Sequence, residues 1–242
     1  MKDRIDDLQI GGLKLYQNDE LYAFTSDAVL LANFDKVKKD AVVVDFGTGS
    51  GVIAILIAYK SKAKIVYGIE IQKVMADMAS RSVALNKLGE RVKIINDTIQ
   101  NAPKILGQGS VDLVVCNPPY SKVGTCKVNE NENAKISRHE VYVTLEEIFE
   151  SASRILKSKG EFRMVHQATR LGEIIACANR YNFTLKKMRL VQSFANDKPH
   201  LVLFKFVKYG GLGVDVLPNL IMNNTDGTYT DEVREIYNKE TL

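Results

Sequence analysis

The sequence predicts an α/β fold in which helices cover both faces of a doubly wound, mostly parallel sheet of seven strands. Strand-like and helix-like segments alternate from about residue 41, as they do in parallel sheets with crossover helices. The strand-like segments are short, apolar and rich in β-branched residues, which is typical of buried strands. The last two follow one another with no helix between them, which predicts an antiparallel pair at one edge of the sheet.

The elements can be placed along the chain from these patterns and from their end signals. Thr144 followed by Glu147 has the spacing of a helix-capping box, and Thr230 or Asp231 could cap a short final helix. The expected order is strand 41–47, helix 50–60, strand 64–70, helix 72–89, strands 92–98 and 111–117, helix 144–160, strand 161–166, helix 169–182, and the closing strands 183–192 and 200–210.

Length and composition indicate one soluble globular domain. The 242 residues are 45% hydrophobic and 26% charged, and no apolar run reaches the roughly 20 residues of a membrane span. The start of the chain lacks a signal-peptide core, so we expect a cytoplasmic protein. We divide the domain, residues 1–242, into an N-terminal segment (1–40) that covers a cofactor, a core (41–208) and a C-terminal tail (209–242). The three cysteines have no metal-like spacing, and we expect no metal.

A glycine-rich loop follows the first predicted strand, from Asp45 to Gly51. Gly47, Gly49 and Gly51 would let the backbone approach a ligand closely between a strand and a helix. The dinucleotide fingerprint requires a glycine where Val52 stands, which disfavours NAD or FAD and favours a smaller nucleoside ligand. The alternative is a tight strand-to-helix turn without a ligand.

Two carboxylates follow at the ends of the next strands. Glu70 ends the second strand about 20 residues after the loop, where an acidic residue can accept hydrogen bonds from ribose hydroxyls. Asp97 ends the third strand and could accept the amine of an adenine. Taken singly, Glu70 could be a solvated strand end and Asp97 a turn or helix-cap acceptor. Together with the glycine loop they predict a ligand site at the carboxyl edge of the sheet.

The fourth strand ends in the sequence Asn117-Pro118-Pro119-Tyr120. The two prolines stiffen this turn and supply no N–H donors. The side-chain oxygen of Asn117 and the carbonyl of Pro118 could accept both hydrogens of an sp² amine, and Tyr120 could stack on its ring. This arrangement would turn the nitrogen lone pair of a planar amine towards an electrophile and stabilise positive charge on that nitrogen. The alternative is a proline turn that only ends a strand.

These motifs resemble the class I S-adenosylmethionine-dependent methyltransferases that act on amino groups, which have a Rossmann-like fold. The resemblance covers most of residues 20–208 and implies S-adenosylmethionine as cofactor. It implies that Asp45 and the glycines hold the methionine part, Glu70 the ribose and Asp97 the adenine. Asn117 to Tyr120 would be the catalytic residues, and Asn117 would also lie at the cofactor. The expected cofactor-binding residues also include Thr48, Ile71 and Thr98.

A closer resemblance, to bacterial tRNA adenine-N6 methyltransferases, rests on segments outside this core. They are YAFTSDAVLLANF before the glycine loop, SRHE after residue 120, and TDGTYTDEVREIY near the end. Members of that family modify the adenine next to the anticodon of a valine tRNA, which implies tRNA as the partner. In such enzymes the first segment lies over the cofactor, so Thr25, Ser26 and Asp27 become expected contacts. Asp27 could instead be an acidic residue at a helix N-terminus.

Several other functions use the same amine-binding motif. They are methylation of a protein glutamine amide, of a guanine N2 in ribosomal RNA, or of adenine in DNA; a non-catalytic nucleoside-binding scaffold is a further alternative. The oligomeric state is open. The polar segment 121–142, with Arg138, His139 and Glu140, could contact RNA or be a solvated loop. We interpret His166 and His200 as structural or surface residues. The basic residues that could follow an RNA backbone are Arg180, Lys186, Lys187, Arg189, Lys198, Lys205 and Lys208.

Overall fold

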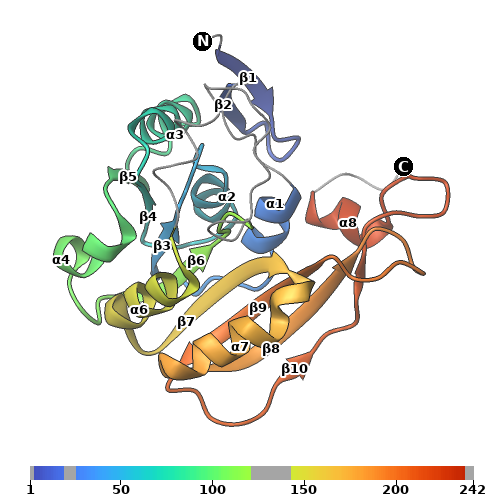
Figure 1. The fold of residues 1–242 in the computed structure, drawn as a ribbon. Coiled ribbons are helices and arrows are strands. Elements are labelled where there is room, and N and C mark those ends of the chain that lie inside the picture. The colour runs from blue at the N-terminus through green and yellow to red at the C-terminus, as the bar shows by residue number, and fades with distance from the viewer. Residues whose placement is uncertain (1–2, 19–25, 121–142, 238–242) are drawn as a thin grey trace, which may run out of the picture.

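The computed structural model of the protein describes residues 3–18, 26–120 and 143–237. A nine-stranded sheet runs through its centre in the order β10-β8-β9-β7-β6-β3-β4-β5, with β11 also paired to β8 (Figure 1). The strands are β3 (Val42–Phe46), β4 (Ile65–Glu70), β5 (Val92–Asn96), β6 (Val111–Cys116), β7 (Leu156–Gln167), β8 (Phe183–Gln192), β9 (Leu201–Lys208), β10 (Asp215–Val216) and β11 (Leu220–Ile221).

The sheet is parallel except for β9, so the predicted fold class is confirmed with two corrections: the sheet has nine strands instead of seven, and its antiparallel strand is not at the edge. β8 and β9 pair antiparallel as expected, but β9 lies inside the sheet between β7 and β8 instead of at its edge. The reason is the helical connection between β7 and β8, which places β8 parallel to β7 but leaves room for one strand between them. The hairpin that follows brings β9 back into the gap. The short strands β10 and β11 then add to the outer side of β8.

Helices cover both faces of the sheet, because the strand residues alternate between two apolar clusters. Val43 belongs to the cluster on one face and Val44 to the cluster on the other. The first face carries α1 (Ser26–Ala32), α2 (Val52–Lys60), α3 (Lys73–Leu85) and α8 (Asp231–Ile236). The second carries η1 (Ile99–Asn101), α4 (Ala102–Leu106), α6 (Leu145–Ile155) and α7 (Leu171–Arg180), which follows η2 (Ala168–Arg170).

Two of the predicted helix starts are confirmed. Thr144 and Glu147 form a complete capping box at α6, and the Thr230 side chain accepts a hydrogen bond from the Val233 N–H at α8. No helix in the described ranges is long and apolar enough to cross a membrane.

The sequence did not predict the N-terminal hairpin of β1 (Asp3–Asp7) and β2 (Lys14–Asn18). The hairpin is fastened to the end of α3. The Ser82 hydroxyl accepts the Tyr16 N–H at 3.0 Å, and the side chain of Asn86 accepts the Lys14 N–H at 3.0 Å. Its position beside α3 is visible in Figure 1. The part of the N-terminal segment expected to cover a cofactor includes residues 19–25, which lie outside the described residues.

The carboxyl ends of the parallel strands meet at one rim of the sheet. β3 is paired with β4 on one side and with β6 on the other, so the loop after β3 lies between the ends of those two strands. The hairpin 193–200 reaches the same rim, because Leu201 of β9 is opposite Gln167 at the end of β7. The Ala168 N–H also donates to the His200 carbonyl at 3.0 Å. Ligands of open α/β sheets bind at such a rim.

Candidate active site

The glycine loop joins β3 to α2 through three left-handed residues. Gly47, Gly49 and Gly51 have φ angles of 67°, 57° and 90°, which side-chain-bearing residues rarely adopt. At Gly51, a Cβ would be 3.3 Å from the Cβ of Ala79 in α3. These angles turn the chain sharply at the rim and leave the loop backbone uncovered by side chains of its own.

Thr48 fixes this loop to the two strands beneath it. Its hydroxyl donates a 2.6 Å hydrogen bond to Asp45 Oδ2. The same side chain lies over Gly68 in β4, where a Cβ would be only 2.8 Å from Thr48 Oγ1. Gly68 was not among the predicted site residues. A lone glycine inside an apolar strand was the available signal, since it often marks a close approach of another segment.

Asp45 is completely buried beneath the loop. Burial raises its pKa from 3.8 to about 7, against the lowering effect of the Thr48 hydrogen bond, and the nearby charge of Glu70 adds to the rise. Its Oδ1 atom accepts no hydrogen bond within the described residues. A buried acceptor without a partner is costly in a folded protein. This part of the site would therefore gain from a positive charge bound close to the loop.

Glu70 connects the end of β4 to the glycine loop. Its Oε2 atom accepts the Gly49 N–H at 3.0 Å and its Oε1 atom accepts the Gln72 N–H at 2.9 Å. The side chain is 5% exposed, and burial raises its pKa in spite of these hydrogen bonds. Each carboxylate oxygen can accept more than one hydrogen. Glu70 is thus held rigidly and retains acceptor capacity for two hydroxyl groups.

Asp97 forms the turn after β5. Its Oδ1 atom accepts hydrogen bonds from the Asn101 side chain at 2.8 Å and from the Thr98 N–H at 2.6 Å, and these bonds lower its pKa. Asp97 Oδ1 is therefore a turn acceptor, as one of the two interpretations expected. Oδ2 remains as a second acceptor. Ile71, in the neighbouring loop, is 44% exposed. An exposed apolar side chain can pack against the face of a base, and a nearby carboxylate can accept hydrogen bonds from its amine.

Asn96 fixes the spacing between these two loops. Its side-chain amide donates to the carbonyls of Glu70 and Ile71 at 2.8 and 2.9 Å. The end of β5 is therefore attached to the chain just after β4. This attachment keeps Glu70 and Asp97, the two predicted nucleoside contacts, at a fixed distance from each other.

The motif that begins with Asn117 follows β6 directly and meets α1. Tyr120 Oη lies 2.5 Å from Asp27 Oδ2 and 3.1 Å from Asn117 Oδ1. Asp27 is in the first turn of α1 and is 8% exposed. Asp27 had been expected to contact the cofactor, and the structure brings it to the tyrosine of the substrate motif. Thr25, its expected companion, lies outside the described residues, as do Arg138, His139 and Glu140.

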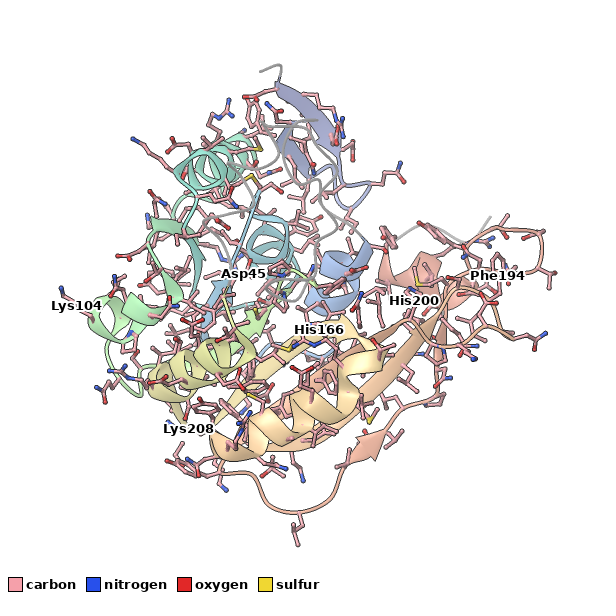
Figure 2. The ribbon with its side chains drawn as sticks, viewed as in Figure 1. Asp45, Lys104, His166, Phe194, His200 and Lys208 are labelled. Atoms are coloured by element: carbon pink, nitrogen blue, oxygen red, sulfur yellow. The ribbon has the colours of Figure 1, made fainter. Side chains whose placement is uncertain are left out.

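His166, at the end of β7, packs against the same tyrosine. The ring centroids of Tyr120 and His166 are 5.2 Å apart at an interplanar angle of 41°. The histidine is 1% exposed, and burial, followed by the charge of Arg170, lowers its pKa to about 4. Figure 2 labels His166 near the centre of the molecule, between the segments that carry α1 and α7. The imidazole is consequently neutral at pH 7 and serves as a packing surface for Tyr120.

Six of the seven basic residues proposed to follow RNA interact within the protein. Lys187 and Lys205 bind Asp35, and Arg189 binds Glu232. The others are Arg180, paired with Glu146, and Lys186 and Lys208, which donate to backbone carbonyls. Lys198 is exposed in the hairpin 193–200 and has neither an ion pair nor a side-chain hydrogen bond within the described residues.

Comparison with known proteins points to methyl transfer. The family model of the methyltransferase small domain matches residues 24–175, more than half of the chain. A tRNA1(Val) (adenine(37)-N6)-methyltransferase of Porphyromonas gingivalis is 26% identical over 194 residues, which cover 78% of this chain and 75% of that protein. The protein of the same name from Proteus mirabilis is 27% identical over 215 residues, covering 86% and 82%.

Two solved structures show a similar fold. A crystal structure of a predicted O-methyltransferase from Agrobacterium tumefaciens superposes with a TM-score of 0.70 at 22% identity, covering 88% of this chain and 96% of that one. The structure of M. jannaschii TYW2 in complex with AdoMet has a TM-score of 0.56 at 19% identity, covering 85% and 86%. At these identities the likeness concerns the fold.

Proposed function

The chain belongs to the methyltransferase small domain family, and on that premise we propose that it methylates N6 of an adenine in tRNA with S-adenosylmethionine as the methyl donor. Relatives about a quarter identical carry the name tRNA1(Val) (adenine(37)-N6)-methyltransferase. The observation that carries the proposal is topological. β3 is flanked by β4 and β6, so the glycine loop has Glu70 on one side and Asn117 on the other. A cofactor and an amine acceptor can therefore meet above one strand.

The described residues fit S-adenosylmethionine. Glu70 accepts the ribose hydroxyls, Asp97 Oδ2 accepts the adenine amine, and exposed Ile71 packs against the adenine face. The glycine loop holds the methionine part above Asp45. A cationic group there favours the charged form of this buried carboxylate, whose pKa is otherwise raised to about 7. When bound, the cofactor supplies an electrophilic methyl group.

The substrate amine is held on the other side of the loop. Asn117 Oδ1 and the Pro118 carbonyl accept its two hydrogens, which turns the nitrogen lone pair out of conjugation and towards the methyl group. Acceptors in a fixed position also stabilise the positive charge that develops on nitrogen in the transition state. Pro118 and Pro119 keep this turn stiff, so little reorganisation is needed during the reaction.

The hairpin 193–200 is suited to hold the RNA around that adenine. Phe194 is 40% exposed at the rim, and Figure 2 labels it with His200 at the outer end of the β8–β9 hairpin. The buried amide of Gln192 donates to the carbonyls of Phe194 and Ala195 at 3.0 and 2.6 Å, which holds the loop in one shape. An exposed ring offers a stacking surface to an unpaired base, and Lys198 offers a charge to phosphate.

A labelled-methyl assay tests the proposal. The protein is incubated with methyl-labelled S-adenosylmethionine and bulk tRNA from cells that lack its gene, and the nucleosides are then separated. We expect label in N6-methyladenosine, with Asn117→Ala as a control that binds cofactor but transfers little methyl. Because glutamine and guanine-N2 methylation use the same motif, parallel reactions contain ribosomal RNA and cell protein. Label in either of these and none in tRNA would refute the assignment.

A further inference from the structure

We propose that Lys60 is a positioning residue for methyl transfer and that it acts through the C-terminal segment 218–237. This segment joins α1, which meets the motif 117–120, to the hairpin 193–200, which is suited to hold RNA. The inference rests on the proposed function, because it assumes a tRNA adenine at that motif. The matched family residues end at position 175, so the segment lies outside the part of the chain that the family model describes.

Lys60 is the last residue of α2, and its ammonium group connects the ends of three helices. Its Nζ atom donates to Asn33 Oδ1 at 2.8 Å and to the Ile236 carbonyl at 2.9 Å. Asn33 directly follows α1 and donates in turn to the Val29 carbonyl at 2.7 Å, while Ile236 ends α8. The carboxyl ends of helices carry partial negative charge, which favours a partly buried ammonium group at this point. One side chain thus holds α1, α2 and α8 together.

Helix α8 also packs on α1 through apolar side chains. Val233 and Tyr237 lie in the same buried cluster as the apolar residues of α1. Burial, followed by the electrostatic effects of Tyr229 and Asp27, raises the pKa of Tyr237, so this tyrosine lies near the first turn of α1. Figure 1 shows the two helices beside each other. The position of α1 therefore depends on α8.

The segment 218–237 is itself held in one shape between its two ends. Arg189 of β8 forms an ion pair with Glu232 of α8 through two hydrogen bonds, at 2.6 and 2.8 Å. A bidentate pair of this kind fixes the relative orientation of its two side chains. The Thr230 hydroxyl donates to the Ile221 carbonyl at 2.8 Å, which connects the start of α8 to β11. A displacement at one end of the segment is therefore passed to the other.

The start of the segment is fastened to the hairpin 193–200. The Asn219 side chain donates to Gln192 Oε1 at 2.8 Å, and the Asn223 N–H donates to the Ser193 carbonyl at 2.9 Å. The nitrogen of the Gln192 side chain donates to two carbonyls of the hairpin. The hairpin and the segment consequently share one buried amide group.

Helix α1 transmits this arrangement to the motif 117–120. The helix has seven residues, Ser26–Ala32, and is about 10 Å long, so a shift at its end also moves its first turn. In that turn, Asp27 accepts a hydrogen bond from the Tyr120 hydroxyl at 2.5 Å. The segment thus fixes the motif relative to the hairpin, and RNA bound at the hairpin presents its adenine to the motif at a constant position.

Lys60→Met tests this role, because it removes both bonds of the ammonium group and keeps an unbranched side chain of similar length. We expect kcat with tRNA from cells that lack the gene to fall about tenfold, since a displacement of about 1 Å at the reacting groups can cost up to about 100-fold in rate. The proposed cofactor contacts come from the glycine loop, Glu70 and Asp97. Calorimetry should therefore show a dissociation constant of S-adenosylmethionine changed less than about twofold.

A matched control and a conservative variant accompany this measurement. Lys62→Met makes the same change two residues later, at an exposed side chain that has no ion pair or hydrogen bond among the described residues, and should keep the wild-type kcat. Lys60→Arg retains a charged donor and should recover part of the lost rate. All rates are measured well below the thermal midpoint of each variant, so that loss of folded protein does not enter.

A variant at the other end of the segment shows whether the two ends act together. Asn219→Ala should also lower kcat at saturating tRNA. Its double variant with Lys60→Met should be no slower than the slower single variant, because both changes break one connection. Rate losses that multiply in the double variant would overturn the inference, as would an unchanged kcat in Lys60→Met.

The remaining outcomes also decide. A raised dissociation constant of S-adenosylmethionine that accounts for the whole loss in Lys60→Met would overturn the inference and make α1 a support for the cofactor. If Lys60→Met does not fold, Lys60→Gln, which can still donate to one of the two acceptors, takes its place under the same criteria. An inactive wild-type protein would count against the proposed function instead.

Discussion

The side chain of Thr48 lies directly against Gly68, so that a Cβ on the glycine would be 2.8 Å from Thr48 Oγ1 and 2.9 Å from its Cγ2. This contact joins the glycine loop to the middle of β4, two residues before Glu70. Thr48 also bonds to Asp45, and Gly49 bonds to Glu70. The proposed cofactor site is therefore built by packing two strand ends against one loop, with no room between them.

Gly68→Ala should disturb the proposed cofactor site and the stability together. The added methyl group pushes Thr48 off Gly68 and loosens its bond to Asp45, and overpacking of this kind costs about 1–3 kcal/mol of unfolding free energy. We expect a lower thermal midpoint and a dissociation constant for S-adenosylmethionine raised by about tenfold or more. Gly89→Ala is the matched control, because a Cβ at Gly89 meets nothing within 4 Å. Equal behaviour of the two variants would show that the Thr48 contact is not needed.

Asp45→Asn should change how stability depends on pH. The pKa of Asp45 is about 7 in the folded protein and 3.8 as its ordinary value, so between these values only the folded state holds the proton. The free energy of unfolding therefore falls as pH rises through this window. Asparagine still accepts from Thr48 and removes this dependence, so relative to wild type it should gain about 3 kcal/mol between pH 5 and pH 8.

Urea unfolding of both proteins at the two pH values measures this difference. His166, whose pKa is lowered to about 4, has the opposite effect below its ordinary value of 6.5, but it is present in both proteins and cancels. A difference between the proteins that stays the same at pH 5 and pH 8 would show that Asp45 is ionised in the folded state throughout.

The sequence predicted the parts of the fold that depend on local pattern. Apolar strand segments and the cap at Thr144 are local and appear where expected, but the helix predicted over 144–160 ends at Ile155, and residues 156–160 belong to β7. The place of β9 inside the sheet depends on how two segments pair across the molecule, which hydrophobic pattern does not encode. The hairpin β1–β2 was missed because its charged residues lack the apolar character of the core strands.

The proposed site divides in the same way. Glycines with positive φ and carboxylates at strand ends follow from chain order, so they could be proposed before the structure. The contacts of Tyr120 with Asp27 and His166 join residues 93 and 46 positions apart, which no spacing rule indicates. For the basic residues late in the chain, the sequence suggested an RNA surface but could not show their partners. In the structure most of their charges are satisfied within the protein.

Asn117→Ala should separate binding from turnover. The alanine variant loses an acceptor for the substrate amine but leaves the glycine loop and Glu70 in place. We expect kcat to fall by about 10² to 10³, as for loss of one transition-state hydrogen-bond partner, with the dissociation constant of S-adenosylmethionine nearly unchanged. Single-turnover methylation and calorimetry give the two values. A parallel loss of cofactor affinity and rate would mean that Asn117 mainly maintains the structure of the loop.

The hairpin 193–200 should contribute to RNA affinity through Phe194 and Lys198. Phe194→Ala removes a stacking surface, which is worth about 1–3 kcal/mol per base, so the dissociation constant for tRNA should rise by about tenfold. Lys198→Ala should weaken binding and reduce the salt dependence by about one phosphate contact. Both residues are exposed, so neither change should alter the thermal midpoint or cofactor binding.

Lys64→Ala is the matched control for the charge, because Lys64 is exposed just before β4 at the opposite end of the sheet from the rim. Fluorescence titrations of tRNA at several salt concentrations give the slope of log affinity against log salt concentration. Lys64→Ala should have the wild-type slope, and Lys198→Ala should have a shallower one. If the two lysine variants share one slope, the phosphate contacts come from other residues, and the hairpin is not part of the RNA surface. The Phe194→Ala titration then decides separately whether stacking occurs there, since loss of a stacked base lowers affinity with little change in the salt slope.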